Sequence, residues 1–227
     1  GKDTFYKPNA CCVYLMDGKF YYNKPVYLSA ATYHNKEFFI KELNIKLKIH
    51  IRLPRNYDKT KTYPVCFLND GQNHYKGYGA YGGWHTDATL EVLSSQGKVM
   101  DVILVAITSP NEREKTFIPP PVCNVDKYIN FICDKILPEL KKEFNISSDR
   151  KKTGFIGASY GAANAVYAGL LRPDVFGLVG SMSFAETAQN IIQRQMKDIH
   201  KLPFHKIYLD CGTKWANNMP HGDDNTH

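Results

Sequence analysis

Residues 157–161 form a pentapeptide with the residue types needed for nucleophilic chemistry, Gly157-Ala158-Ser159-Tyr160-Gly161. It follows a short apolar run and leads into a stretch of small residues, which predicts a strand, a sharp turn with Ser159 at its apex, and a helix. Such a turn lifts the serine hydroxyl above the edge of a sheet, where it can attack a carbonyl carbon. The two glycines leave room for strand and helix to approach closely. An ordinary glycine-rich strand–helix turn is the alternative interpretation.

The rest of the chain must supply the elements that position this serine. Apolar runs predict buried strands at residues 63–70, 101–109, 153–158, 175–183 and 206–212. Helical patterns predict helices at residues 125–144 (kinked at Pro138), 160–171 and 187–199. Aliphatic and polar residues alternate over residues 43–53, which is typical of an antiparallel edge strand with one solvent-exposed face. Together these patterns predict an α/β fold, with a mostly parallel central sheet, helices on both faces and an antiparallel N-terminal edge.

The composition favours one domain and excludes several classes of partner. The 227 residues are 43% hydrophobic, enough for a single sizeable core. No apolar run approaches the roughly 18 residues of a membrane span. The net charge of +7 comes from scattered lysines, and the longest basic cluster is Arg150-Lys151-Lys152. We therefore expect neither nucleic acid nor a membrane as a partner.

The six cysteines show no C-x-x-C pair and no zinc-type spacing, so we expect no metal. Cys66, Cys133 and Cys211 lie inside apolar runs, where a free thiol behaves as a small buried hydrophobe. This favours a reducing, cytoplasmic compartment, although the even count leaves a disulfide open. The chain begins at Gly1 rather than Met, so secretion after removal of a leader is the alternative.

Several segments together resemble the putative-esterase branch of the α/β-hydrolases, which includes esterase D and the feruloyl, acetylxylan and siderophore esterases. The matching segments are residues 51–58, 63–65, 68–73 and 84–87, Arg113 before a Pro-rich stretch, the turn at Ser159, and residues 181–183 and 207–213. The resemblance covers about residues 40–214 and implies an α/β-hydrolase domain over residues 39–227. Residues 1–38, rich in Tyr and Phe, match no segment of the family, and we interpret them as a β-rich lead-in that packs on this domain.

The resemblance implies that Ser159 is the nucleophile of a carboxylic ester hydrolase that works through an acyl-enzyme and needs no cofactor. Two backbone N–H groups would then hold the oxyanion. One would be that of Tyr160, and the second would come from the loop after the first buried strand, at Gly71 or Gln72. A plain turn at Asp70-Gly71 is the alternative for that loop.

Aromatic and proline residues fall on loops or turns that lead toward the predicted pocket, among them Trp84 and Phe184. A mouth of this kind suits a flat or apolar acyl group, or a sugar ring stacked on indole, better than a highly charged ligand. We therefore expect small acyl or aryl esters, including those of carbohydrates, as substrates. Aromatic side chains that merely plug the end of the sheet are the alternative.

The catalytic acid of the family has no counterpart at its usual place. After the last strand the family pattern is Gly-Thr-x followed by Asp or Glu, whereas Trp215 follows Gly212-Thr213-Lys214 here. Asp223 and Asp224, a short loop further on, are the candidate replacements. Asp210 is another nearby carboxylate, and its place near the strand end also suits a structural hydrogen bond.

The catalytic histidine of the family follows the acid by one more helix and strand, and no histidine of this sequence stands there. His74 and His85 fall on loops at the expected active-site edge, but the family's base does not come from those loops. In one explanation the polypeptide continues beyond His227, and a missing C-terminal strand and helix cover the apolar strand at residues 206–212. In the other, the chain has lost catalysis and is a binding or scaffolding protein on a hydrolase fold.

Overall fold

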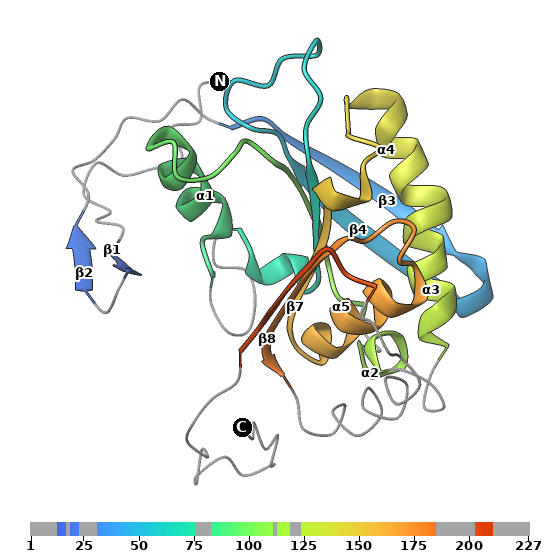
Figure 1. Cartoon of the computed structure of the whole chain (residues 1–227). Coiled ribbons are helices and arrows are strands. Elements are labelled where there is room, and N and C mark those ends of the chain that lie inside the picture. The colour runs from blue at the N-terminus through green and yellow to red at the C-terminus, as the bar shows by residue number, and fades with distance from the viewer. Residues whose placement is uncertain are drawn as a thin grey trace, which may run out of the picture.

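The computed structural model of the chain describes residues 13–16, 19–22, 31–75, 83–110, 113–118, 124–184 and 203–210. These residues form one large sheet with helices on both sides (Figure 1). A separate antiparallel hairpin is made of β1 (Val13–Met16) and β2 (Lys19–Tyr22). No helix within the described ranges has both the length and the apolar character needed to cross a bilayer.

The described part of the large sheet has seven strands in the spatial order β3-β4-β6-β5-β7-β8-β9. Their bounds are β3 (Tyr33–Ile40), β4 (Ile45–Arg52), β5 (Val65–Leu68), β6 (Ile103–Ile107), β7 (Thr153–Ser159), β8 (Leu178–Phe184) and β9 (Lys206–Leu209). The five strands β6, β5, β7, β8 and β9 are parallel to one another, whereas β4 is antiparallel to both β3 and β6. The predicted mostly parallel sheet with an antiparallel N-terminal edge is therefore confirmed.

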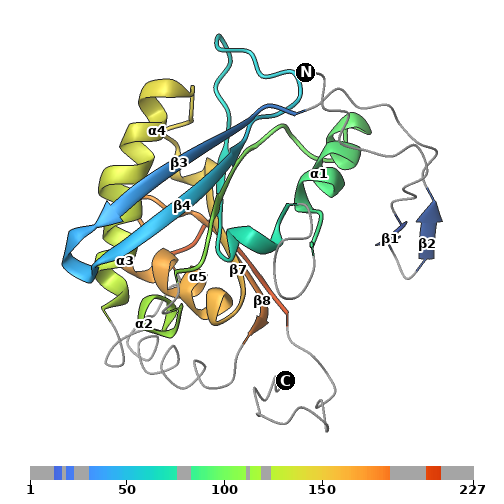
Figure 2. The same ribbon diagram turned by 180° about the vertical axis from the view of Figure 1, so that it is seen from behind.

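The strand β4 has the alternation that its sequence predicts. Its buried side chains include Leu47, Ile49 and Ile51, each fully buried. Lys46 and Lys48, at alternate positions, are exposed. β4 is one strand in from the edge, because β3 pairs with its outer side (Figure 2). β3 also runs across the domain boundary predicted between residues 38 and 39, so residues 33–38 are part of the main sheet.

Two cores lie on opposite faces of the sheet, and different helices cover them (Figures 1 and 2). The larger core lies under α3 (Val125–Phe131), α4 (Leu137–Glu143) and α5 (Tyr160–Leu171). At its centre the rings of Phe67, Phe155 and Phe176 pack with centroids 5.2 to 6.1 Å apart. The smaller core contains Leu68 and packs against Leu90 of α1 (Thr86–Ser95). Helices on both faces are thus confirmed.

The helix predicted at residues 125–144 is present but irregular. Between α3 and α4 lies a π-helical segment, η3 (Ile132–Ile136), and Pro138 follows at the start of α4. Proline has no N–H and its ring crowds the carbonyl four residues earlier, so a wider turn just before it relieves both problems. α5 coincides with the helix predicted at residues 160–171, whereas the helix predicted at residues 187–199 lies outside the described residues.

Two of the predicted buried thiols fall in the described part of the chain. Cys66 and Cys133 are free, and burial raises the pKa of each thiol to about 12. Both therefore remain protonated near neutral pH and act as packing groups rather than nucleophiles. Cys211 lies outside the described residues.

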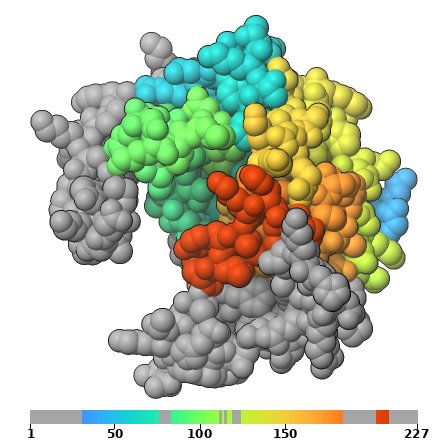
Figure 3. Space-filling view, viewed as in Figure 1, coloured from blue at the N-terminus to red at the C-terminus, as the bar shows by residue number. Residues whose placement is uncertain are grey.

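The strand β9 forms the far edge of the described sheet and lies on the molecular surface (Figure 3). Two of its large side chains are among the most exposed hydrophobic ones, with Tyr208 59% and Leu209 61% exposed. β9 pairs in parallel with β8, which brings its carboxyl end to the same edge of the sheet as that of β7.

Candidate active site

Ser159 is the last residue of β7 and the N-cap of α5, so it stands where strand turns into helix. We call this turn, residues 157–161, the elbow. Its backbone has φ 57° and ψ −124°, a conformation that non-glycine residues adopt rarely and at a cost in energy. The side chain is half-buried. This corner lies at the carboxyl ends of the parallel strands, which is where open α/β sheets bind their ligands.

Gly157 and Gly161 make the corner sterically feasible. A Cβ atom on Gly157 would lie 2.1 Å from the carbonyl oxygen of Gly161, because strand and helix touch there backbone to backbone. A Cβ atom on Gly161 would lie 3.1 Å from Oδ2 of Asp70 and 3.2 Å from Cβ of Asn69. The start of α5 is therefore packed tightly on the loop that follows β5.

The first N–H groups of α5 are available at this corner. An α-helix pairs each N–H with the carbonyl four residues earlier, so the N–H of Tyr160 has no partner within the helix. The positive end of the helix dipole also lies here and favours negative charge. Tyr160 thus remains suited to the oxyanion role predicted for it.

Asn69 fixes the loop after β5 to the elbow at Ser159. Its backbone N–H donates to the carbonyl of Ile156 at 2.9 Å, which continues the pairing of β5 with β7 beyond the end of β5. Its side-chain Nδ2 donates to the carbonyl of Gly161 at 3.1 Å and to Oδ1 of Asn164 at 3.0 Å, both in α5. Asn69 is fully buried, so loop and elbow form one packed unit.

The same loop turns sharply at Asp70 into a short 3₁₀ helix, η2 (Gly71–Asn73). Asp70 has a left-handed backbone with φ 58°. A Cβ atom on Gly71 would lie 2.7 Å from backbone atoms of β6, so only glycine fits there without a shift.

The side chain of Gln72 is anchored in the adjacent loop. Its Nε2 donates to Oγ of Ser109 at 3.1 Å, and its Oε1 accepts from the backbone N–H of Ser109 at 3.0 Å. The N–H groups of Gly71 and Gln72 are the first of η2 and have no partner within it. Both remain suited to the second oxyanion donor.

The buried carboxylate of Asp70 forms an ion pair with the partly exposed Arg113, the first residue of α2 (Arg113–Phe117). Arg113 donates from Nε to Oδ1 at 2.9 Å and from Nη2 to Oδ2 at 2.8 Å, and the hydroxyl of Ser109 donates to Oδ1 as well. Arg113 also donates to the carbonyl of Ala158 at 3.4 Å. Sequence patterns assigned no role to Arg113, Ser109 or Asn69, because no spacing pattern links the residues after β5 and β6 with the start of α2.

The structure assigns His74 a structural role. Its Nε2 lies 2.9 Å from the carbonyl of Asn69, which can only accept, so Nε2 carries the proton. Nδ1 then accepts from the hydroxyl of Thr86 at 2.8 Å. Burial lowers the pKa of His74, which keeps the ring neutral. With both nitrogens occupied, His74 is not available to accept a proton from Ser159, and His85 is an exposed residue before α1.

Trp84 and Phe184 lie on two sides of the elbow. Trp84 is 37% exposed, and its ring meets that of His74 edge to face at 5.0 Å between centroids. Its backbone N–H donates to the carbonyl of Asn73, which ties it to the loop after β5. Phe184 ends β8 and is paired in register with Ser159. Both predicted substrate-binding positions are thus on elements that adjoin the elbow.

The predicted acids fall largely outside the described residues. Asp223 and Asp224 lie there, as does the Gly212–Trp215 segment. Asp210 is described and exposed, and its Oδ1 accepts from the backbone N–H of Ser183 at 2.7 Å. This is the structural hydrogen bond expected as one of its two roles.

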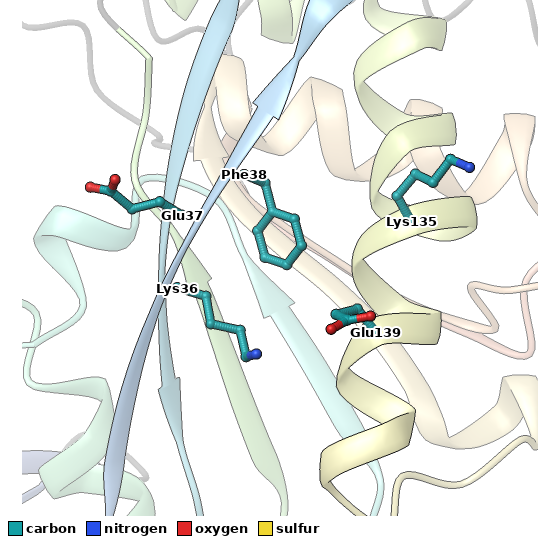
Figure 4. A pocket seen from close by; sticks show the side chains of 5 residues that line it. All are labelled: Lys36, Glu37, Phe38, Lys135 and Glu139. Atoms are coloured by element: carbon teal, nitrogen blue, oxygen red, sulfur yellow. The ribbon is translucent and has the colours of Figure 1, made fainter.

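A groove of about 380 Å³ lies between β3 and the helix of η3 and α4, and its lining residues are Lys36, Glu37, Phe38, Lys135 and Glu139 (Figure 4). Lys36 and Phe38 extend toward the helix, while Glu37 points to the other side of the strand. β4, β6 and β5 separate β3 from β7, so this groove is remote from Ser159. Its lining residues include no serine, cysteine or histidine, so it is not a candidate active site for the chemistry expected of Ser159.

Comparisons with known proteins agree with this arrangement. The family model described as "Putative esterase" matches residues 40–221. An uncharacterized protein of Bacillus subtilis, YjcH, is 27% identical over 188 residues, which cover 81% of this chain and 74% of that protein.

Two solved esterases share the fold. A ferulic acid esterase from Anaeromyces mucronatus in complex with ferulic acid has a TM-score of 0.53 and 26% identity, covering 69% of this chain and 59% of that chain. The enterobactin esterase of Shigella flexneri has a TM-score of 0.61 and 21% identity, covering 73% of this chain and 42% of that chain. The present chain thus spans less than two thirds of the length of either esterase.

The match over residues 40–221 includes both the elbow and the loop after β5. The chain belongs to the putative esterase family, a family of carboxylic ester hydrolases built on the α/β-hydrolase fold.

Proposed function

We propose that this protein is a serine ester hydrolase in which Ser159 forms an acyl-enzyme with small acyl or aryl esters. The observation that supports this most directly is the backbone of Ser159, with φ 57° and ψ −124° at the junction of β7 and α5. A strained serine at the amino end of a buried helix is of little use to packing alone. Strain of this kind is kept where the surrounding structure holds a functional group in place.

The chemistry would proceed in two stages. The Oγ atom of Ser159 attacks the ester carbonyl carbon while its proton passes to a base, and the alcohol then leaves with a proton. Water attacks the acyl-enzyme in the same way and releases the acid. In both stages the carbonyl oxygen becomes negative, and the N–H groups of Tyr160 and of Gly71 or Gln72 would stabilise it.

The substrate class rests on the surroundings of the elbow. Trp84 presents a partly exposed indole beside the loop after β5, and an indole binds flat rings well. The solved Anaeromyces mucronatus esterase holds ferulic acid, an aromatic acid, and shares the fold and 26% of its sequence over the matched region. Small aryl and short acyl esters are therefore the substrates that we propose, carbohydrate esters among them.

A covalent probe tests the nucleophile. A fluorophosphonate should label Ser159, and Ser159→Ala should abolish both labelling and the hydrolysis of p-nitrophenyl acetate. Ser183→Ala is the matched control, since Ser183 also has a positive φ (46°) near the end of a neighbouring strand but caps no described helix. Labelling at Ser183, or hydrolysis that persists in Ser159→Ala, would refute the assignment.

A binding or scaffolding protein on the same fold is the second candidate function. The described histidines that form side-chain hydrogen bonds make them elsewhere, His50 with Asn35 and His74 with Thr86 and Asn69. A serine without a base would give only residual hydrolysis. A protein that binds aryl esters without turnover and leaves Ser159 unlabelled would support this candidate instead.

A further inference from the structure

Arg113 contacts both halves of the proposed site at once. Its guanidinium forms two parallel hydrogen bonds to Asp70, in the loop after β5. It also donates to the carbonyl of Ala158, the residue before the nucleophile. The same group lies 5.7 Å from the ring centroid of Tyr160, the residue after the nucleophile. One side chain therefore spans the loop after β5 and the elbow.

Asp70 needs such a partner because its carboxylate is almost fully buried. The side chain is 3% exposed, and Oδ2 lies only 3.1 Å from where a Cβ atom of Gly161 would be. A buried, unpaired carboxylate is costly. It would also repel the negative charge that develops on a substrate oxygen held by the neighbouring N–H groups. The bidentate guanidinium offsets that charge and fixes its geometry.

We propose that Arg113 is a positioning residue for ester hydrolysis: it holds the Asp70 loop against the elbow and neutralises Asp70 beside the developing oxyanion. The proposal rests on the proposed function, because it assigns Arg113 the support of the loop that supplies an oxyanion donor in that reaction. Its effect belongs to the transition state, since the ground-state ester oxygen carries little charge.

The chain offers a matched control at the opposite end of α5. Arg172 also forms two parallel hydrogen bonds to an aspartate, Asp174, at 2.9 and 3.0 Å, and a third to Asp134 at 2.8 Å. It follows the last residue of α5, whereas Ser159 precedes the first. Removing Arg172 thus breaks an ion pair of the same bidentate geometry, with an exposed aspartate, away from Ser159.

The test uses three single variants of the full chain, Arg113→Met, Arg113→Lys and Arg172→Met. A double variant combines Arg113→Met with Asp70→Asn. Active serines are titrated with fluorophosphonate, and kcat and KM for p-nitrophenyl acetate are expressed per titrated serine. Arg113→Met should lower kcat about 100-fold, the scale of losing an oxyanion donor, with KM little changed. Arg113→Lys should be intermediate, because lysine keeps the charge but not the fork. The double variant should recover part of the loss, because the unpaired charge is gone.

Two further measurements separate positioning from folding. The affinity for a trifluoromethyl ketone, which forms an oxyanion with the serine, should fall in parallel with kcat for the Arg113 variants. Arg172→Met should lower the melting temperature without changing kcat per titrated serine. If Arg113→Met folds poorly, titration still counts its active fraction, and Arg113→Lys supplies a second comparison.

Three outcomes would overturn the proposal: unchanged kcat per titrated serine in both Arg113 variants, a rise in KM alone, or no recovery in the double variant. A rise in KM alone would make Arg113 a substrate-binding group. Failure of the proposed function is distinct from all three, since the wild type itself would then resist labelling at Ser159 or keep its activity in Ser159→Ala.

Discussion

The loop after β5 and the end of β8 flank β7 at the same edge of the sheet, but they are held very differently. Each contains a non-glycine residue with positive φ, Asp70 at 58° and Ser183 at 46°. Asp70 is buried and accepts from both Arg113 and Ser109. On the other side Asp210 is exposed and accepts from the backbone of Ser183. The turn at Asp70 is held by a buried network of polar side chains, whereas the turn at Ser183 is held by a hydrogen bond at the surface.

This difference bears on one requirement of an ester hydrolase. The nucleophile and the oxyanion donors must be fixed before the substrate arrives, and a buried, satisfied polar network provides that rigidity. Asn69, with its side chain bonded to Gly161 and Asn164, belongs to the same network. The β8–β9 side is solvent-exposed, where single hydrogen bonds contribute little. We infer that stability and catalytic geometry are coupled on the β5 side of Ser159 and largely uncoupled on the β8 side.

The largest expected effect comes from Gly157, where strand and helix touch. Gly157→Ala would place a methyl group 2.1 Å from the carbonyl oxygen of Gly161, and neither backbone can move without opening the elbow. We expect a loss of about 3 kcal/mol or more in the free energy of unfolding, measured by urea denaturation, and loss of fluorophosphonate labelling.

Gly154→Ala in the same strand is the control. Its Cβ atom would meet Sγ of Cys66 at 3.4 Å and other atoms at longer, ordinary contact distances. The change should therefore alter the free energy of unfolding by no more than about 1 kcal/mol. Equal costs for the two substitutions would contradict the close strand–helix contact on which the elbow depends.

A pH effect of intermediate size should arise from His74, which ties the loop after β5 to α1. Burial lowers its pKa in the folded state, so below about pH 6.5 the unfolded chain binds a proton that the folded chain does not. Stability is therefore complete above that pH and is lost as the pH falls toward the folded pKa, by at most about 1.4 kcal/mol per pH unit. Urea unfolding at pH 7.5 and 5.5 should show a smaller loss for His74→Gln than for the wild type.

His50 provides the comparison for this experiment. Its pKa is also lowered by burial, but it lies on β4 and bonds to Asn35 on β3, away from the elbow. His50→Gln should reduce the pH dependence of unfolding without altering the pH dependence of kcat. If His74→Gln unfolds with the same pH dependence as the wild type, His74 is not the buried neutral group that its contacts indicate.

Local sequence patterns were sufficient for most of the fold and for the strand–turn–helix junction at Ser159. Continuous apolar runs identified the parallel strands, because burial on both faces leaves no polar positions, and the small residues of α5 marked the helix packed closest to the sheet. α1 was not predicted, since residues 86–95 bury little beyond Leu90 and Glu91 and show no clear apolar stripe. β3 was not predicted as part of the sheet for a similar reason. Its exposed positions include the aromatic residues Tyr33 and Phe39, so its sequence does not alternate cleanly between polar and apolar residues.

The supporting groups of the site could not be predicted in the same way. Asp70 and Arg113 are 43 residues apart, and Asn69 and Asn164 are 95 residues apart. They meet only because β5 pairs with β7 on one side and β6 on the other, an order that no local pattern encodes. The family resemblance marked Asp70 and Arg113 as matching positions, but it carried no information on their contact.

The smallest effect should come from Asp210, on the open side of the comparison. Its carboxylate accepts from the backbone of Ser183 and also raises the pKa of Tyr208 through a hydrogen bond, and both aspartate and tyrosine are exposed. Asp210→Ala should cost about 0.5 kcal/mol of unfolding free energy, as surface substitutions do. Because the Asp210 carboxylate accepts from the Ser183 N–H at the end of β8 rather than orienting a catalytic base, kcat for p-nitrophenyl acetate should change little. A loss on the scale of the roughly 10⁴-fold seen when a serine protease loses its acid would instead make Asp210 the catalytic acid. The site would then extend onto β9, and the β8 side would be coupled to catalysis as closely as the β5 side.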